Sequence, residues 1–402
     1  MSGQAKQLNF DLETELIIEC SQTAINSAKF DRIAYLLSQS PDWNYIFKIA
    51  NRNAILPLVS WNLLQNFEHL IPDEFRELIH KDFQEHTRNN MFLTGKLVEI
   101  INLFQSNDIA IVPFKGPILA IRAYGNLALR QFIDLDILIP ILHLEKAVKL
   151  LTEAGYIPLN LQRLDNLKRK KDVGFISEDE RVRVEMHWKL SGRHFSMPLE
   201  MNQLWHQLET VKLAGMDVSA FSFNTLLIYL CLHGARHSWE RFGWICDINE
   251  LVRAESDVDW RQVFNEAKRL GCESVLGLGL YLAYDFFGLK ISTPKWQEIE
   301  DDQIIKELAR QIRSRIFADK PATLEIGDRY LYHLKLKEKW TDKWKLHLHY
   351  NYWYLKIIFS PNEIDKGLFH LPSWLSPLYY VLRPPRLLYS YLLKPKTRVA
   401  KN

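Results

Sequence analysis

The sequence has only four cysteines in 402 residues, and no two of them are spaced as C-x-x-C. Zinc knuckles and disulfide frameworks need cysteines at characteristic spacings, so neither is predicted. Scattered thiols are typical of proteins from a reducing compartment, and we expect a cytoplasmic location. The first residues, MSGQAKQLNFDLETELIIEC, are polar and lack the apolar segment of a secretory signal peptide.

Long uncharged apolar runs are missing as well. A helix that spans a membrane needs about 20 predominantly apolar residues. The nearest candidate, GLFHLPSWLSPLYYVL, is shorter and is interrupted by Pro372 and Pro377. No membrane-spanning segment is therefore predicted.

Several standard catalytic motifs are also absent. The chain contains no G-x-x-x-x-G-K-[ST], no G-x-G-x-x-G, no G-x-S-x-G and no H-E-x-x-H. His233 and His237 are four residues apart, a spacing that can bind zinc on a helix. No cysteine or acid at a recognised spacing completes that site, so zinc chemistry is not predicted.

Excess positive charge is confined to the C-terminal end. The whole chain has a net charge of +3, which gives no reason to expect nucleic acid as a partner. Residues 331–402 hold 13 Lys and Arg against 4 Asp and Glu, a net charge of +9, so the rest carries −6. This basic, aromatic region can be the surface of helices packed on the core, or it can contact a membrane or a partner.

What the sequence does contain is a change of hydrophobic period. Apolar residues recur every three or four positions up to about residue 106, and this helical period returns after Ser196. Between these points, short apolar runs alternate with helical ones. The sequence predicts an α+β protein with four regions: a helical region over 1–107, an α/β core over 108–195, a helical domain over 196–330 and the basic aromatic helical region over 331–402.

The core has recognisable strand and helix candidates. We predict strands over 109–114 and 131–139, a short helix over GPILAIRAYG, a helix over HLEKAVKLLTEAG and another strand over YIPL. The runs DVGFIS and RVRVEMHWKL flank the polar turn EDE, which is typical of a hairpin. Together these elements predict a mixed sheet with few helices.

The second strand candidate, QFIDLDILI, carries two acids. Alternation along a strand would send Ile133, Leu135 and Ile137 to the core and would leave Asp134 and Asp136 together on the other face. Such a pair can bind a hard cation such as Mg²⁺, can lie on an ordinary half-solvated strand, or can pair with a nearby cation such as Arg130. The stretch alone leaves all three open.

A third acid lies on the last strand of the predicted hairpin. In RVRVEMHW, the apolar side chains share one face, and Arg183, Glu185 and His187 share the other. Glu185 can therefore face the two aspartates from a neighbouring strand. Three facing carboxylates make a metal site more plausible than two.

Four stretches of the chain together resemble the uncharacterised bacterial nucleotidyltransferase family of the polymerase-β superfamily: FKGPILAIRAYGNLALRQFIDLDILI, VEMHWKL, CLHGARHSWERFGWICDINEL and LPSWLSPLYYVLRPPRLL. The resemblance implies a small polymerase-β-like core embedded between helical N- and C-terminal regions. Asp134 and Asp136 match the superfamily's paired strand aspartates, and Glu185 matches its third carboxylate. The resemblance therefore implies that these three residues are catalytic and bind two divalent ions, Mg²⁺ or Mn²⁺.

The resemblance also implies a nucleotide-binding turn. Gly116 falls at the glycine of the phosphate-facing turn, Lys115 precedes it, and Arg130 falls at the position before the acidic pair. These three residues are expected to contact the phosphates of an NTP. Pro117 replaces a second small residue of the superfamily and has no N–H to offer a phosphate.

A helical segment around His233, His237 and Asp247 matches the family too. Two alternatives remain open for it. His233 and Asp247 can form a hydrogen bond across two crossing helices, which is a packing role. Alternatively, both can line an acceptor pocket together with His187 and His237.

The expected function is transfer of a nucleoside monophosphate from an NTP such as ATP to an acceptor, with release of pyrophosphate. The acceptor is expected to be a small molecule, a peptide or a protein, since no strong basic face near the core favours long nucleic acid. The alternative is a nucleotide-binding pseudo-enzyme or an interaction protein that keeps the fold without turnover. The sequence also allows the C-terminal region to contact a membrane surface peripherally.

Overall fold

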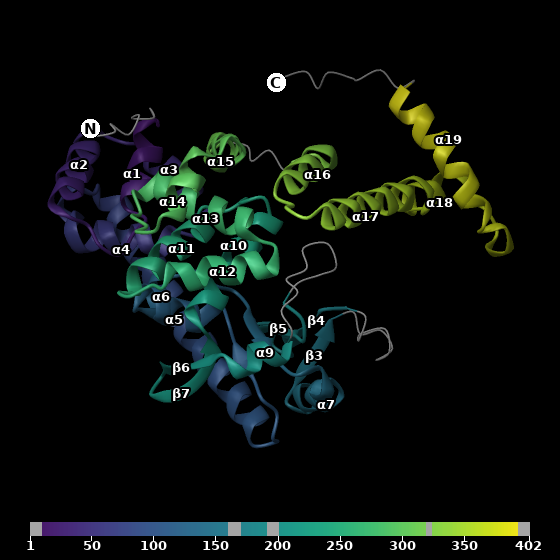
Figure 1. Cartoon of the computed structure of the whole chain (residues 1–402), viewed down its shortest axis with the longest axis horizontal. Helices are drawn as coiled ribbons and strands as arrows, with labels where there is room; N and C mark the ends of the chain where they lie inside the picture. The colour runs from purple at the N-terminus through teal and green to yellow at the C-terminus, as the bar shows by residue number, and fades with distance from the viewer. Residues whose placement is uncertain (1–9, 160–169, 191–200, 319–323, 393–402) are drawn as a thin grey trace. The chain divides into compact units, whose positions relative to one another are not determined.

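The computed structural model describes residues 10–159, 170–190, 201–318 and 324–392 (Figure 1). The chain divides into two compact units, Met1–Glu338 and Lys339–Asn402. The first unit contains the sheet and the helices that surround it. Its secondary structure confirms the predicted α+β class.

The first unit begins with helices: α1 (Leu12–Glu19), α2 (Ser27–Ser38), α3 (Trp43–Arg52), α4 (Leu56–Asn66) and α5 (Asp73–Gln105). The side chains of Asp11, Asn26 and Asp42 cap the first three by accepting a backbone N–H. Helix α5 is 33 residues long. Its apolar face, which includes Leu93 and Leu97, recurs at helical spacing and is buried against the sheet.

Five strands form the main sheet: β1 (Val112–Pro113), β2 (Leu135–Leu138), β3 (Tyr156–Leu159), β4 (Asp172–Ser177) and β5 (Arg183–His187). Their order is β1-β2-β5-β4-β3. Only β2 and β5 pair in parallel, and the other neighbours are antiparallel. The predicted mixed sheet and the β4–β5 hairpin are thus confirmed.

Helices α6 (Gly116–Tyr124) and α7 (Leu144–Glu153) connect strands of this sheet, as predicted. The strand predicted over 131–139 is shorter than expected, because β2 begins only at Leu135. Ile133 lies before the strand and is 59% exposed, so its predicted place in the core is wrong. Leu135 and Ile137 are fully buried, as alternation requires.

A second, two-stranded sheet corrects the expectation of helix after Ser196. After α9 (Met201–His206), strands β6 (Leu208–Leu213) and β7 (Met216–Phe221) form an antiparallel hairpin. The turn residues Ala214 and Gly215 both have positive φ, 49° and 82°. Two such residues match the right-handed twist of a tight hairpin, which explains why this stretch leaves the helical pattern.

Helices complete the first unit: α10 (Phe223–Arg236), α11 (Gly243–Ala254), α12 (Trp260–Leu270), α13 (Glu273–Phe287), α14 (Lys295–Asp301), α15 (Gln303–Ile316) and α16 (Ile326–Lys335). Helix α10 packs against α11 and α13, and α11 packs against α6 (Figure 1). The contact between α11 and α6 joins the helical layer to the sheet. A large apolar core fills the helical layer, and a second one lies between the sheet and α5 and α7.

The second unit contains α17 (Trp340–Phe359), α18 (Glu363–Phe369) and α19 (Leu378–Leu392). Within it, α17 packs against α19. The buried carboxylate of Asp365 pairs with Arg383 and Arg386 of α19. None of the helices in the described ranges is both long and apolar enough to cross a bilayer.

Candidate functional site

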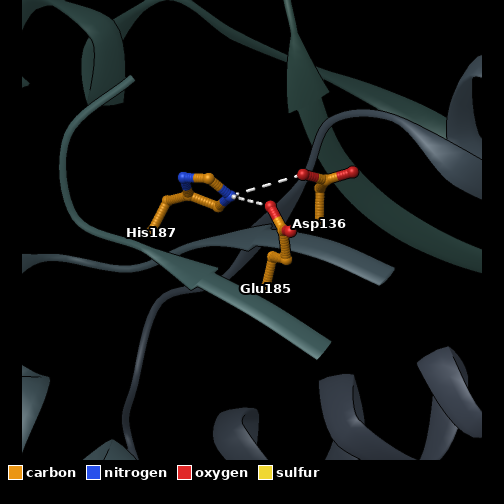
Figure 2. Close-up of side chains that lie close together, drawn as sticks. All are labelled: Asp136, Glu185 and His187. Carbon is orange, nitrogen blue, oxygen red and sulfur yellow. Dashed lines mark ion pairs between the residues drawn. The ribbon is translucent and has the colours of Figure 1, made fainter. Parts of the chain in front are cut away.

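The parallel pairing of β2 with β5 brings acidic and imidazole side chains together. Asp136 lies opposite Glu185 in the register, and Leu138 lies opposite His187. Because side chains two residues apart share a face of a strand, Glu185 and His187 project on the side of Asp136. Figure 2 shows the Nε2 atom of His187 directed at both carboxylates.

The carboxylate of Asp136 is buried, with 1% of its side chain exposed. Its Oδ2 atom lies 2.9 Å from Nζ of Lys115, and its Oδ1 atom lies 3.3 Å from Nε2 of His187. Burial alone would raise its pKa, but Lys115 and His187 together outweigh burial and hold the pKa below its ordinary value. Asp136 is therefore ionised, yet its Oδ1 atom has no hydrogen-bond partner among the described residues.

His187 lies between three carboxylates. Its Nε2 atom is 3.5 Å from Oε2 of Glu185, and its Nδ1 atom is 3.7 Å from Oδ2 of Asp172. The ring of Phe114 packs edge-on against the imidazole at 5.2 Å. Burial works to lower the pKa of His187, but Asp136 and Glu185 prevail and raise it. The imidazole in turn lowers the pKa of Glu185, whose side chain is 48% exposed.

Asp134 differs from Asp136 although the two are only one residue apart. It lies just before β2, is half-buried, and lines the same cleft. Burial and then the charge of Asp136 raise its pKa. An added cation beside Asp134 would relieve both effects.

The turn before α6 places Lys115 and Gly116 over the acids. Gly116 has φ +53°, a conformation that L-residues rarely adopt, and a Cβ there would lie 3.4 Å from the carbonyl oxygen of Asp134. Glycine thus permits the close approach that puts Lys115 on Asp136. Both conformation and space favour glycine at this position.

Arg130 lies on the same cleft but is engaged by a partner from the helical layer. Its Nε and Nη2 atoms donate to Oδ1 and Oδ2 of Asp247 at 2.8 and 3.0 Å. The hydroxyl of Tyr124 also donates to Asp247, at 2.8 Å, and the amide of Asn90 donates to the carbonyl oxygen of Arg130. The salt bridge that the sequence suggested with Asp134 is replaced by this pair with Asp247.

Two histidines of α10 and its C-cap face Trp244 of α11. The rings of His233 and His237 lie 5.0 and 5.5 Å from that indole. Burial lowers the pKa of both, that of His237 to about 4, so both imidazoles are neutral near pH 7. The hydrogen bond that we considered between His233 and Asp247 is not formed, because Asp247 is turned to Arg130 and Tyr124.

A single cleft of about 630 Å³ collects all of these groups. Every residue that the sequence pointed to lines it: Lys115, Gly116, Arg130, Asp134, Asp136, Glu185, His187, His233, His237 and Asp247. Trp244, Lys171, Tyr229 and Arg236 line it too, and sequence reasoning did not single them out. The cleft thus has an acidic end on the sheet and an aromatic, basic wall on the helices.

The position of His187 beside the acids has a signal in the sequence. Glu185-x-His187 on β5 repeats the i, i+2 spacing of Asp134-x-Asp136. Parallel pairing of β2 with β5 puts Asp136, Glu185 and His187 on one face, and Asp134 lies just before β2. The sequence analysis assigned His187 to an acceptor pocket, whereas the structure brings it to the acids.

The donor set of this cluster suits a divalent cation. One ligand atom each from Asp136, Glu185 and His187 lies within 4.8 Å of the others. Carboxylate oxygens and imidazole nitrogens are common metal ligands in proteins. The cluster can therefore hold a metal ion, with Asp134 near enough to interact electrostatically with Asp136 and Glu185.

A comparison with known protein families gives a match over much of the chain. The family model described as "Uncharacterised nucleotidyltransferase" matches residues 39–288, a range that includes every residue of the cleft. No curated protein and no solved structure matches the chain.

Proposed function

Because the chain belongs to the uncharacterised nucleotidyltransferase family, we propose that it moves a nucleoside monophosphate from an NTP to an acceptor and releases pyrophosphate. The family supports nucleotidyl transfer in general. The metal dependence, the acceptor and the residue roles that follow are our proposal. The observation that carries it is the buried carboxylate of Asp136, whose Oδ1 atom faces Glu185 and His187 without a hydrogen bond.

We propose that Asp134, Asp136 and Glu185 hold divalent ions at the acidic end of the cleft. When bound, such ions neutralise charge on the phosphates and lower the pKa of an attacking hydroxyl. The raised pKa of Asp134 fits this role, since a carboxylate destabilised by its neighbours gains from a cation. Magnesium and manganese are the candidates.

The chain's own residues would bind and orient the nucleotide. Lys115 pairs with Asp136 in the structure. We propose that its flexible side chain moves from Asp136 to a β- or γ-phosphate oxygen when the nucleotide binds. The open turn at Gly116 lets a phosphate approach the backbone. Arg130 uses two of its five N–H donors on Asp247, and we propose that the remaining donors contact phosphate.

In the transfer itself, an oxygen of the acceptor forms a bond to the α-phosphorus while the bond to the bridging oxygen of the β-phosphate breaks. The electron pair of that bond leaves with pyrophosphate. As the alternative to holding an ion, we propose that Glu185 takes the proton of the acceptor, because it is the most exposed acid of the cluster and its pKa is low enough to keep it ionised.

The acceptor is proposed to be a small molecule, a peptide or a protein that enters along the helical wall. Neutral His233 and His237 beside Trp244 offer hydrogen-bonding and stacking surfaces there. The alternative of a nucleotide-binding protein without turnover is favoured by one residue, Pro117, which cannot donate an N–H to a phosphate.

Calorimetry tests the nucleotide and metal site, and a turnover assay then distinguishes the two alternatives. ATP, GTP, CTP and UTP are each titrated with Mg²⁺ into the wild-type protein and into Asp134→Asn/Asp136→Asn. Metal-dependent binding that the double variant loses supports the proposal, and incubation with α-labelled nucleotide then tests turnover. Asp217→Asn on β7, whose side chain is 62% exposed, is the matched control and should bind as wild type does. Binding that survives in the double variant would contradict the metal-dependent mechanism.

A further inference from the structure

His187 has no part in the transfer chemistry described above, although it is the most enclosed side chain of the acidic cluster after Asp136. Its side chain is 4% exposed. Neither ring nitrogen has a hydrogen-bond partner in the part of the chain that the structure describes. Buried polar atoms are almost always satisfied, so an exception of this kind marks a place where an ion, a water or a ligand belongs.

The distances around Nε2 fit a shared ion better than hydrogen bonds. Nε2 is 3.3 Å from Oδ1 of Asp136 and 3.5 Å from Oε2 of Glu185. Two ligand atoms that each lie about 2.1 Å from one ion are about 3.0–3.4 Å apart for angles between 90° and tetrahedral. The two distances from Nε2 lie close to this range, and all three ligand atoms lie within 4.8 Å of one another.

The two oxygens of Asp136 are used differently, which leaves one free for such an ion. Oδ2 pairs with Lys115, whereas Oδ1 faces His187 and has no hydrogen bond. Lys115 therefore supports the carboxylate from one side and does not block the other. Figure 2 shows one carboxylate oxygen each of Asp136 and Glu185 facing the same nitrogen of His187.

The far side of the imidazole has the partner that metal-bound histidines usually have. Nδ1 lies 3.7 Å from Oδ2 of Asp172, which in turn pairs with Lys171. A histidine that binds a metal through one nitrogen generally donates the other N–H to a carboxylate, a carbonyl or water, and this contact fixes the tautomer and the ring. Asp172 is therefore a positioning residue. A small movement of its carboxylate toward Nδ1 of His187 would form this hydrogen bond.

We infer that His187 is a metal ligand through Nε2, together with Asp136 and Glu185, and that this site selects a first-row transition ion over Mg²⁺. Mg²⁺ prefers all-oxygen ligand sets, whereas an imidazole nitrogen favours softer divalent ions. The inference rests on the proposed function only for the place of the ion in the reaction. Binding of the metal alone does not depend on it.

The test uses Mn²⁺ alone, added to the full-length protein without nucleotide. Calorimetry measures the affinities for Mn²⁺ and Mg²⁺, and pulsed electron paramagnetic resonance measures whether a ¹⁴N nucleus couples to the bound Mn²⁺. We expect Mn²⁺ to bind at least tenfold more tightly than Mg²⁺, with a clear ¹⁴N coupling. His187→Gln should abolish the coupling and weaken Mn²⁺ binding about 10–100-fold, and should change Mg²⁺ binding less than threefold.

Two further variants separate a ligand from its neighbours. His237→Gln removes another imidazole of the same cleft and should keep both the coupling and the affinity. Asp172→Asn should keep the coupling and should weaken Mn²⁺ binding by about tenfold.

Absence of Mn²⁺ binding, bound Mn²⁺ without ¹⁴N coupling, or coupling that survives in His187→Gln would each overturn the inference. A protein that binds Mn²⁺ through His187 but no NTP would contradict the proposed function and leave the inference intact. Mg²⁺-dependent transfer by a protein that shows no ¹⁴N coupling would support the proposed function and overturn the inference.

Discussion

The cleft contains two buried carboxylates that look alike in the sequence and differ in their surroundings. Asp247 binds the guanidinium of Arg130 with both oxygens and also accepts from the hydroxyl of Tyr124. Asp136 pairs with Lys115 through one oxygen only and turns the other to His187. A buried ion pair with every acceptor used holds elements together, whereas an unused acceptor leaves room for a ligand.

This difference separates the parts of the cleft by role. The Arg130–Asp247–Tyr124 network ties the segment before β2 and helix α6 to helix α11, so it fixes the sheet against the helical layer. The cluster of Asp136, Glu185 and His187 contributes little to that connection, since its members lie on adjacent strands. We therefore expect substitutions in the first group to change stability and substitutions in the second to change activity.

The largest effect is expected at Asp136. Asp136→Asn removes the charge that would face the proposed ion, and nucleotidyl transfer should fall by at least about 10³-fold, because a preorganised charge at a phosphoryl centre contributes this much. The free energy of unfolding should change by no more than about 1–2 kcal/mol, since Lys115 keeps Asp134 as a neighbouring charge. Transfer assays and urea denaturation measure the two effects. A variant that retains transfer would contradict the assignment.

Asp247→Asn should show the opposite balance. It leaves the buried guanidinium of Arg130 without its charged partner, and removing one member of a buried pair costs about 3–5 kcal/mol of stability. The transfer rate of the protein that remains folded should fall much less than in Asp136→Asn. Denaturant unfolding measures the first quantity. Unchanged stability would show that the pair is not structural.

Gly116, next to Lys115, tests how far the backbone conformation of this turn matters for nucleotide binding. Gly116→Ala forces an L-residue to φ +53°, which costs about 1–2 kcal/mol, and brings a methyl group to the carbonyl of Asp134. Nucleotide affinity should fall together with stability. Gly95→Ala on α5 is the matched control, because its added methyl meets nothing within 4 Å. That change should stabilise the helix by about 0.5–1 kcal/mol.

The smallest effect is expected at Tyr124. Tyr124→Phe removes one of the hydrogen bonds to Asp247 and should cost about 1 kcal/mol in the free energy of unfolding. In a double-mutant cycle, the variant that carries both Tyr124→Phe and Asp247→Asn should lose less stability than the sum of the losses in the two single variants. The reason is that both substitutions break the same network. Full additivity would mean that the hydroxyl acts independently of Asp247.

The sequence predicted the local features of this cleft better than it predicted which distant residues contact each other there. Alternation placed Glu185 and His187 on one face of a strand, and the family resemblance pointed to Asp134, Asp136 and the turn at Gly116. Periodicity cannot tell which strands pair or in which direction, and the parallel register that joins Asp136 to Glu185 comes from tertiary packing.

Longer-range contacts were further out of reach. Arg130 and Asp247 are 117 residues apart in the chain, and no local pattern links them. The β6–β7 hairpin, by contrast, has a local signal in Ala214-Gly215 between alternating runs, which the sequence analysis overlooked.

The difference in role between Asp136 and Asp247 is tested most directly by thermal unfolding with and without Mn²⁺. The proteins compared are the wild type, Asp136→Asn and Asp247→Asn. A ligand that binds only the folded state raises its stability, by about 4 kcal/mol at 1,000 times the dissociation constant. We predict that the melting temperature of wild type rises with Mn²⁺, that Asp136→Asn shows no rise, and that Asp247→Asn begins lower but rises by a similar amount. A rise in Asp136→Asn equal to that of wild type, or its loss in Asp247→Asn alone, would contradict the account.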